Sequence, residues 1–157
     1  MIGRRACLAM SLVGLPIATL IGATSIGRAQ SVQPAPSRLA LKGYDPVAYF
    51  TDSKATPGEP QYEAAYDGVR YRFASAQHLE MFKADPDRYA PQFGGSCAAG
   101  IATGVKVEAE PENWLIVDGK LFVFSGPKSL DSMRADSSGT IAKGRENWKT
   151  LANAPYQ

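Results

Sequence analysis

The sequence predicts an α+β fold, namely a small single domain of two antiparallel hairpins packed with short helices. Two Asp-Gly pairs, Asp67-Gly68 and Asp118-Gly119, each lie between runs rich in aromatic and β-branched residues. Such pairs favour the tight turn of a β-hairpin, because both central residues of a type I′ turn need positive φ. Residues typical of helix starts follow each hairpin. Hairpins and helices that occupy separate stretches of a chain are typical of the α+β class.

The first hairpin is expected in residues 61–74, after a loop that carries Gly, Pro and charged residues. Ser75 is a good N-cap for a helix over residues 76–83, because its hydroxyl can accept a hydrogen bond from a free N–H of the first turn. Asp85 and Pro86 supply a second cap with proline at the first helical position, so a second, short helix is expected there.

The second hairpin is expected in residues 114–124, and its nearly continuous apolar sequence predicts burial on both faces. A small helical turn is expected before it, through Ile101 and Ala102. Two further helices are expected over residues 127–135 and 140–151, the second with apolar residues at helical spacing. The segments that flank the two Asp-Gly pairs do not match in sequence, so no internal duplication is expected.

Residues 1–29 are expected to form a signal peptide. Arg4 and Arg5 precede a mostly apolar run, and Gly27-Arg28-Ala29 provides a small-x-small cleavage site. The apolar run is interrupted and short for a bilayer span, so no permanent membrane anchor is expected after cleavage. We therefore expect a periplasmic or secreted protein.

Residues 30–39 are rich in Pro, Ser and Gln and are expected to form a flexible lead, which leaves residues 40–152 as the folded domain. The chain of 157 residues carries 17 Lys and Arg against 15 Asp and Glu. Three of these arginines lie in the expected signal peptide, so the remaining chain is close to neutral. Because it contains no basic block, no nucleic-acid partner is expected.

Cys97 is the only cysteine that remains after signal cleavage, and it lies in the stretch GGSCAAG at residues 94–100. If Ser96 caps a short helix, the sulfur lies in the first turn, where free N–H groups and the helix dipole favour a thiolate. The two preceding glycines indicate a turn that exposes the thiol. The alternative is a buried thiol that packs as a small hydrophobic side chain.

His78 is the only histidine in the chain, and Met81 lies three residues later on the expected helix, a spacing that places both on one face. Together with Cys97 they would provide two sulfur donors and one nitrogen donor, a set that suits Cu(I) better than hard cations. We therefore predict Cys97, His78 and Met81 as metal ligands, with copper as the candidate cofactor. We also predict Cys97 and His78 as the candidate catalytic pair. A closed zinc site is not expected, because zinc usually takes four such ligands.

Several separated motifs resemble the YHS-domain family. They are GYDPVAYF at residues 43–50, YRFASAQHLEMFKADPDRYAPQFGG at residues 71–95, and SCAAG at residues 96–100. The likeness is to the exported group, in which selenocysteine replaces the cysteine of the Gly-Gly-x-Cys-Ala segment in some members. That resemblance implies a small α+β domain, and it implies redox or soft-metal chemistry at Cys97.

The chain is more distantly similar to metal-handling YHS modules, in which cysteines follow an Asp-Pro-Val and occur in a Phe-Cys-Ser-x-x-Cys pattern. The matching positions in this sequence are Ala48, Ala74 and His78. The resemblance therefore implies that two of the three thiols are lost and that an imidazole stands at the third position.

The sequence thus indicates an exported YHS-domain protein with a reactive thiol at Cys97, assisted by His78. It would bind a soft metal ion such as copper or take part in thiol redox chemistry. The mature chain has no resolving cysteine, so a redox cycle would need a thiol-containing partner. The alternative is a non-catalytic ligand-binding or protein-interaction module in which Cys97 is structural.

Overall fold

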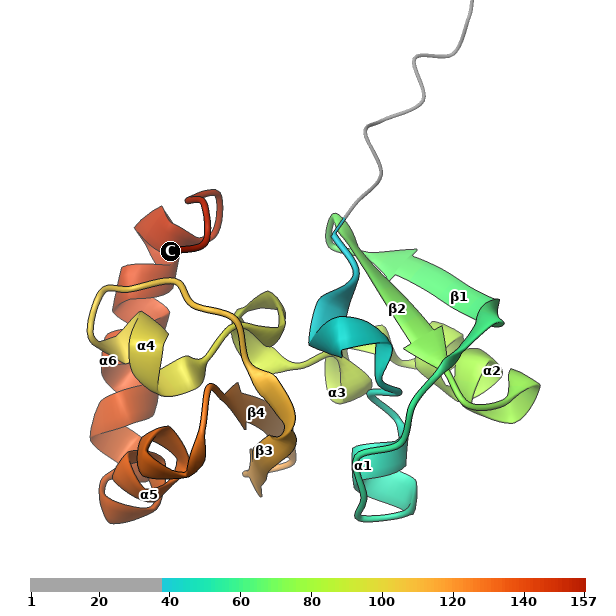
Figure 1. The fold of residues 1–157 in the computed structure, drawn as a ribbon, viewed down its shortest axis with the longest axis horizontal. Coiled ribbons are helices and arrows are strands. Elements are labelled where there is room, and N and C mark those ends of the chain that lie inside the picture. Colours follow the sequence, from blue (N-terminus) through green and yellow to red (C-terminus); the bar gives the residue numbers. More distant parts are fainter. Residues whose placement is uncertain (1–37) are drawn as a thin grey trace, which may run out of the picture. The chain divides into compact units, whose positions relative to one another are not determined.

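The computed structural model describes residues 38–157, which form two successive runs of the same kinds of element (Figure 1). The first run consists of the 3₁₀ helix η1 (Ala40–Gly43), α1 (Ala48–Thr51), β1 (Glu59–Tyr66), β2 (Val69–Phe73), α2 (Ala76–Ala84) and α3 (Pro86–Tyr89). The second run consists of the 3₁₀ helix η2 (Gln92–Gly95), α4 (Ala98–Ala102), β3 (Glu110–Val117), β4 (Lys120–Phe124), α5 (Pro127–Ala135) and α6 (Ser137–Leu151). The expected small α+β domain is confirmed. The expected signal peptide and most of the expected lead lie outside the described residues.

The helix caps and hairpin turns form where the sequence predicts them. The Ser75 hydroxyl accepts a hydrogen bond from the His78 N–H at the start of α2, and Asp85 caps α3 in the same way. Both residues of each Asp-Gly pair have positive φ and connect antiparallel strands. The last helix begins at Ser137, three residues earlier than expected, because the carboxylate of Asp136 caps it.

The two runs repeat one another with a spacing of 51 residues in their hairpins and the helices that follow, and of 52 residues in their 3₁₀ helices. Strands β1 and β3 begin at Glu59 and Glu110, and helices α2 and α5 begin at Ala76 and Pro127. In each hairpin the register shifts at an irregularity after the first residue pair. Each run also begins with a 3₁₀ helix that contains two successive residues in the left-handed region. The chain therefore contains a structural duplication, and the expectation that it would not is wrong.

Strand β4 lies between two hydrophobic cores. Leu121 and Val123 belong to the core of the first run, together with Phe82 of α2. Phe122 and Phe124 belong to the core of the second run. Successive side chains of a strand point to opposite faces, so one strand can serve both cores. The expected burial on both faces is confirmed for β4, whereas β3 is only partly buried.

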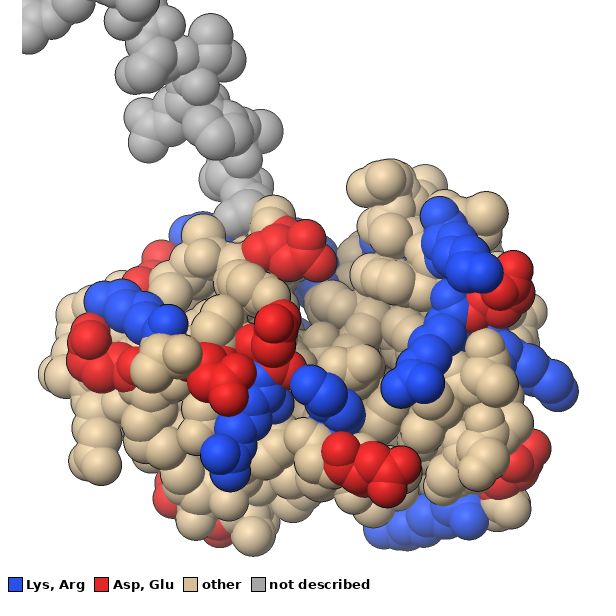
Figure 2. Space-filling model, turned by 180° about the vertical axis from the view of Figure 1, so that it is seen from behind, with Lys and Arg blue, Asp and Glu red and all other residues tan. Residues whose placement is uncertain are grey.

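Charged residues of both signs are interspersed on the face shown in Figure 2. Several form exposed ion pairs in which both partners belong to the same helix. Examples are Lys83 with Glu80 on α2 at 2.9 Å and Arg134 with Asp131 on α5 at 3.2 Å. Exposed pairs of this kind contribute about 0–1 kcal/mol each, so the cores must stabilise the fold. Within residues 38–157, no helix has the length and apolar character needed to span a bilayer.

Candidate functional site

Asp45 is the centre of a polar site in the first run, and its side chain is fully buried. Its Oδ1 accepts hydrogen bonds from the N–H groups of Val47 at 2.8 Å and Ala48 at 3.4 Å, at the start of α1. Its Oδ2 accepts from the N–H of Ala74 at 2.8 Å, just after β2, and lies 2.6 Å from Nδ1 of His78 on α2. One carboxylate thus joins three segments, a role that the sequence reasoning missed.

The short contact with Asp45 fixes the orientation of the His78 ring. A carboxylate only accepts hydrogen bonds, so Nδ1 carries the proton, and in the neutral ring Nε2 holds the lone pair. Nε2 lies 3.4 Å from the hydroxyl oxygen of Thr51. That hydroxyl has one proton and two acceptors within reach, the Val47 carbonyl at 3.3 Å and Nε2. Nε2 is the ring nitrogen that Asp45 does not hold, on a side chain that is 15% exposed.

Tyr49 of α1 is buried near this site and serves as a hydrogen-bond donor. Its hydroxyl donates to the Pro111 carbonyl at 3.0 Å, and its ring meets that of Trp114 edge to face at 5.2 Å. Burial raises the pKa of Tyr49 well above its usual range, and the charge of Glu112 acts in the same direction. The phenol therefore stays neutral at physiological pH and is a poor candidate for a metal ligand.

Met81 lies one helical turn after His78 on α2, as its spacing predicted. Its side chain is partly buried and packs against the core of the first run. Two of the three predicted ligands therefore belong to one helix.

Cys97 lies in the second core rather than at the surface. Only 1% of the residue is exposed, and it belongs to the same apolar cluster as Ile101 and Phe122. Its Sγ accepts a hydrogen bond from the Gly100 N–H at 3.4 Å, so Cys97 itself, and not Ser96, is the N-cap of α4. The expectations of an exposed thiol and of a cap at Ser96 are therefore wrong.

Cys97 occupies in the second run the place that Asp45 holds in the first. Each lies two residues after its 3₁₀ helix. The Asp45 N–H donates to the Thr56 carbonyl at 2.8 Å, and the Cys97 N–H donates to the Val107 carbonyl at 3.0 Å. Cys97 and His78 thus belong to different runs, at the start of α4 and on α2, which lie far apart in Figure 1. The structure does not bring them together.

The expected set of Cys97, His78 and Met81 is therefore not assembled, because the duplication places the sulfur in the other half. Among the described residues, no group of three or more His, Cys, Asp and Glu side chains is placed to hold a metal ion. The described residues therefore do not fit a closed metal site. The individual roles expected of these residues stay predictions.

A shallow depression of about 270 Å³ lies over Cys97. Ser125 and Ser129 line it, with their hydroxyl oxygens 3.1 Å apart, and so does the exposed Lys128. Ser129 stands 51 residues after His78, so a hydroxyl replaces the imidazole in the second run. The thiol therefore forms part of the floor of an open hollow although almost none of it is accessible.

We expect the native Cys97 thiol to react with a maleimide about 100-fold more slowly than the same thiol in urea, a factor that corresponds to a local opening of roughly 2.7 kcal/mol. The measurement uses a Cys7→Ser chain, in which Cys97 is the only thiol. A chain that also carries Cys97→Ser and Ser132→Cys places an exposed thiol on the rim of the same depression and serves as the control. Equal native rates for the two thiols would show that Cys97 is accessible.

The fold and the Asp45–His78 pair define a small α+β module built around one buried carboxylate and one imidazole. Residues 47–93, from just before α1 into η2, match the family model of the YHS domain. The matched segment includes His78 and Met81, whereas Asp45 lies just before it and Cys97 just after it. The YHS domain is linked to metal binding. No curated protein and no solved structure matches the chain.

Proposed function

We propose that this protein binds a soft or borderline metal ion through the His78 imidazole of its YHS domain, and that copper is the favoured ion. The observation that carries the proposal is the contact of 2.6 Å between Nδ1 of His78 and Oδ2 of Asp45. Histidines that bind metals almost always donate their second ring N–H to such a group, which fixes the tautomer and directs the other nitrogen to the metal. Nε2 of His78 meets this requirement.

The thioether of Met81 is the candidate for a second ligand, since it follows His78 by one turn on α2. Imidazole and thioether donors suit copper better than they suit calcium or magnesium. The remaining ligands would come from water, a small molecule or the thiol of a partner protein. So few protein ligands favour exchange of the ion with a partner over permanent storage.

We further propose that the protein is exported and acts in the periplasm or outside the cell, as a member of the exported YHS group. The support is the sequence of residues 1–29, with its two arginines, apolar run and small-x-small motif.

Thiol redox chemistry at Cys97 is the second candidate function, favoured by the depression over the sulfur. With a hydroperoxide as oxidant, the sulfur would attack the O–O bond, which breaks to give a sulfenic acid on Cys97 and an alcohol. A partner thiol would then condense with the sulfenic acid to give a mixed disulfide and water. The burial of Cys97 favours instead a structural thiol in a module without catalysis.

We expect His78→Ala to weaken copper binding by at least about tenfold, because it removes the one nitrogen ligand. Gln77→Ala, at an exposed neighbouring position on α2, and Cys97→Ser are both expected to keep the wild-type affinity. Met81→Leu is expected to lose less copper affinity than His78→Ala. The measurement is copper affinity and stoichiometry by competition with a chelator of known affinity, with circular dichroism to check that each variant folds.

Wild-type copper binding by a folded His78→Ala variant would contradict the proposal. If Cys97→Ser loses copper while His78→Ala keeps it, the metal site lies at the thiol.

A further inference from the structure

A cleft of about 400 Å³ lies between the two runs and takes no part in the proposed metal site. The turn of the first hairpin, the segment that joins the runs, α6 and the C-terminal residues line it. Its size falls within the range of pockets that hold small organic molecules. Five aromatic residues line the cleft, namely Tyr66, Tyr71, Phe93, Trp148 and Tyr156. Tyr71 and Phe93 are buried, so Tyr66, Trp148 and Tyr156 offer most of the flat apolar surface.

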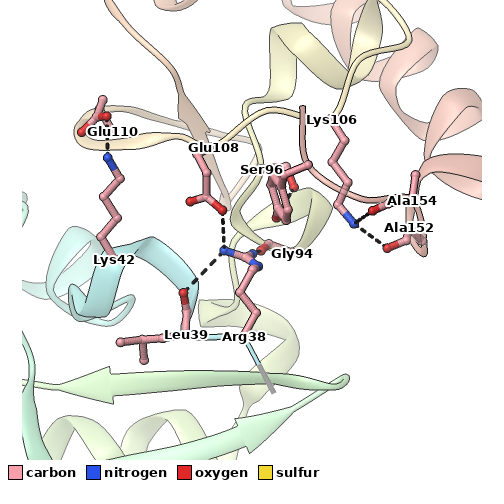
Figure 3. A network of polar contacts seen from close by, with 11 residues as sticks. Arg38, Leu39, Lys42, Gly94, Ser96, Lys106, Glu108, Glu110, Ala152 and Ala154 are labelled. Atoms are coloured by element: carbon pink, nitrogen blue, oxygen red, sulfur yellow. Dashed lines mark hydrogen bonds and ion pairs between the residues drawn. The ribbon is translucent and has the colours of Figure 1, made fainter. Parts of the chain in front are cut away.

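Lys106 provides a buried positive charge in this cleft, since only 7% of the residue is exposed. Its Nζ donates to the carbonyls of Ala152 at 2.7 Å and Ala154 at 2.9 Å (Figure 3). Nζ also lies over the rings of Trp148 and Tyr156, at 5.3 Å and 4.9 Å from their centroids. All four partners are neutral, and no carboxylate of residues 38–157 lies within ion-pair distance of this ammonium group.

A buried charge without a counter-ion is costly, and an anion that entered the cleft would remove that cost. An ammonium group has three N–H donors, and the two carbonyls use only two of them. Burial of Lys106 lowers its pKa, and the nearby Arg38 acts in the same direction, so the surroundings favour an added negative charge.

Two arginines also line the cleft. The Arg38 guanidinium lies 4.8 Å from the centroid of the Tyr156 ring and forms a long ion pair with Glu108 at 3.6 Å (Figure 3). Arg145 of α6 is exposed, lines the cleft, and has no ion-pair partner among residues 38–157. Three cations therefore line the cleft, and only Arg38 forms an ion pair among residues 38–157.

Acidic residues line the cleft from the first run and limit where an anion can bind. Asp67 belongs to the turn of the first hairpin, and Asp87 of α3 accepts a hydrogen bond from the Tyr66 hydroxyl. These carboxylates would repel a negative group. An anion is therefore expected at Lys106, whose ammonium group has no carboxylate partner among residues 38–157.

We infer that this cleft binds a small organic anion that carries a flat apolar group. Lys106, Arg38 and Arg145 hold the negative group, and the apolar group packs on Trp148 and Tyr156. The ligand class is that of an aromatic phosphate monoester or carboxylate, and its binding does not depend on a metal ion at His78.

Phenyl phosphate is the probe, titrated into the full chain by calorimetry in the absence of metal. Benzyl alcohol lacks the charge and inorganic phosphate lacks the ring, so both are expected to bind at least about tenfold more weakly. Lys106→Met is expected to weaken binding of phenyl phosphate by at least about tenfold, and Arg145→Gln by about threefold. Lys128→Met, at an exposed position outside the cleft, is the control and is expected to change nothing.

Arg145→Gln changes only an exposed side chain and therefore tests the inference even if Lys106→Met fails to fold. No binding of phenyl phosphate would overturn the inference, as would equal affinity for benzyl alcohol. Unchanged affinity for phenyl phosphate in Arg145→Gln would also overturn it, as would unchanged affinity in a folded Lys106→Met variant.

Discussion

Asp45→Ala is expected to lower the free energy of unfolding by about 3–5 kcal/mol, the cost of leaving buried polar groups without partners. The substitution removes both acceptor oxygens from the N–H groups of Val47, Ala48 and Ala74, and it removes the partner of the His78 ring. Because these groups start α1, follow β2 and lie on α2, three segments lose one shared anchor. Urea unfolding followed by circular dichroism measures the change.

Asp52→Ala is the matched control, since Asp52 is an exposed aspartate directly after α1. It is expected to change stability by less than about 0.5 kcal/mol. Asp45→Asn is expected to lower the free energy of unfolding by an amount between these two. Its amide keeps one acceptor oxygen, but its NH₂ group faces N–H donors that the second carboxylate oxygen accepted from. If Asp45→Ala and Asp52→Ala unfold at the same urea concentration, the carboxylate does not join the three segments.

The hairpins and helix starts could be predicted from the sequence because short-range chemistry determines them. An Asp-Gly turn needs positive φ, and an N-cap needs a side-chain acceptor, whatever the rest of the chain does. Ser75 and Asp85 therefore cap helices as predicted. At Cys97 the same reasoning was one residue off, because the thiol accepts the hydrogen bond expected of the Ser96 hydroxyl.

The duplication was missed because the two runs share residues mainly at turns, strand ends and caps. Both first strands begin with Glu-Pro, both turns are Asp-Gly, and both second strands end in Phe. The core positions differ between the runs, since a core accepts different apolar residues of suitable volume. The repeat is recognised from the strand register and the position of the irregularity, and both are defined only once the strands pair.

The candidate site was predictable only in part. His78 and Met81 were identified as rare donors at helical spacing, and the structure places both on α2. The missing partner was Asp45, which lies 33 residues before His78 and meets it only when α1 and α2 pack on one core. Cys97 was assigned to the same site as the only cysteine outside the expected signal peptide, but rarity does not show which half of a fold a residue joins.

Phe82→Ala is expected to lower the free energy of unfolding by about 3–5 kcal/mol, the usual range when a buried aromatic ring is removed and a cavity remains. Phe82 is 1% exposed, and its ring centroid lies 5.0 Å from that of Phe73, 5.1 Å from that of Tyr71 and 6.1 Å from that of Tyr66. The cavity would be surrounded by rigid rings that cannot easily close it. Thermal and urea unfolding of the full chain measure the loss.

Phe82→Met is the matched control, because the second run has Met133 at the equivalent position, 51 residues later and fully buried. A swap between apolar residues of similar volume costs less than about 1.5 kcal/mol, and the flexible thioether can fill the space between the rings. Since β4 contributes to both cores, both variants are expected to unfold in one cooperative transition. Equal losses for Phe82→Ala and Phe82→Met would mean that the specific ring contacts, rather than the filled volume, stabilise this core, and the equivalence with Met133 would fail.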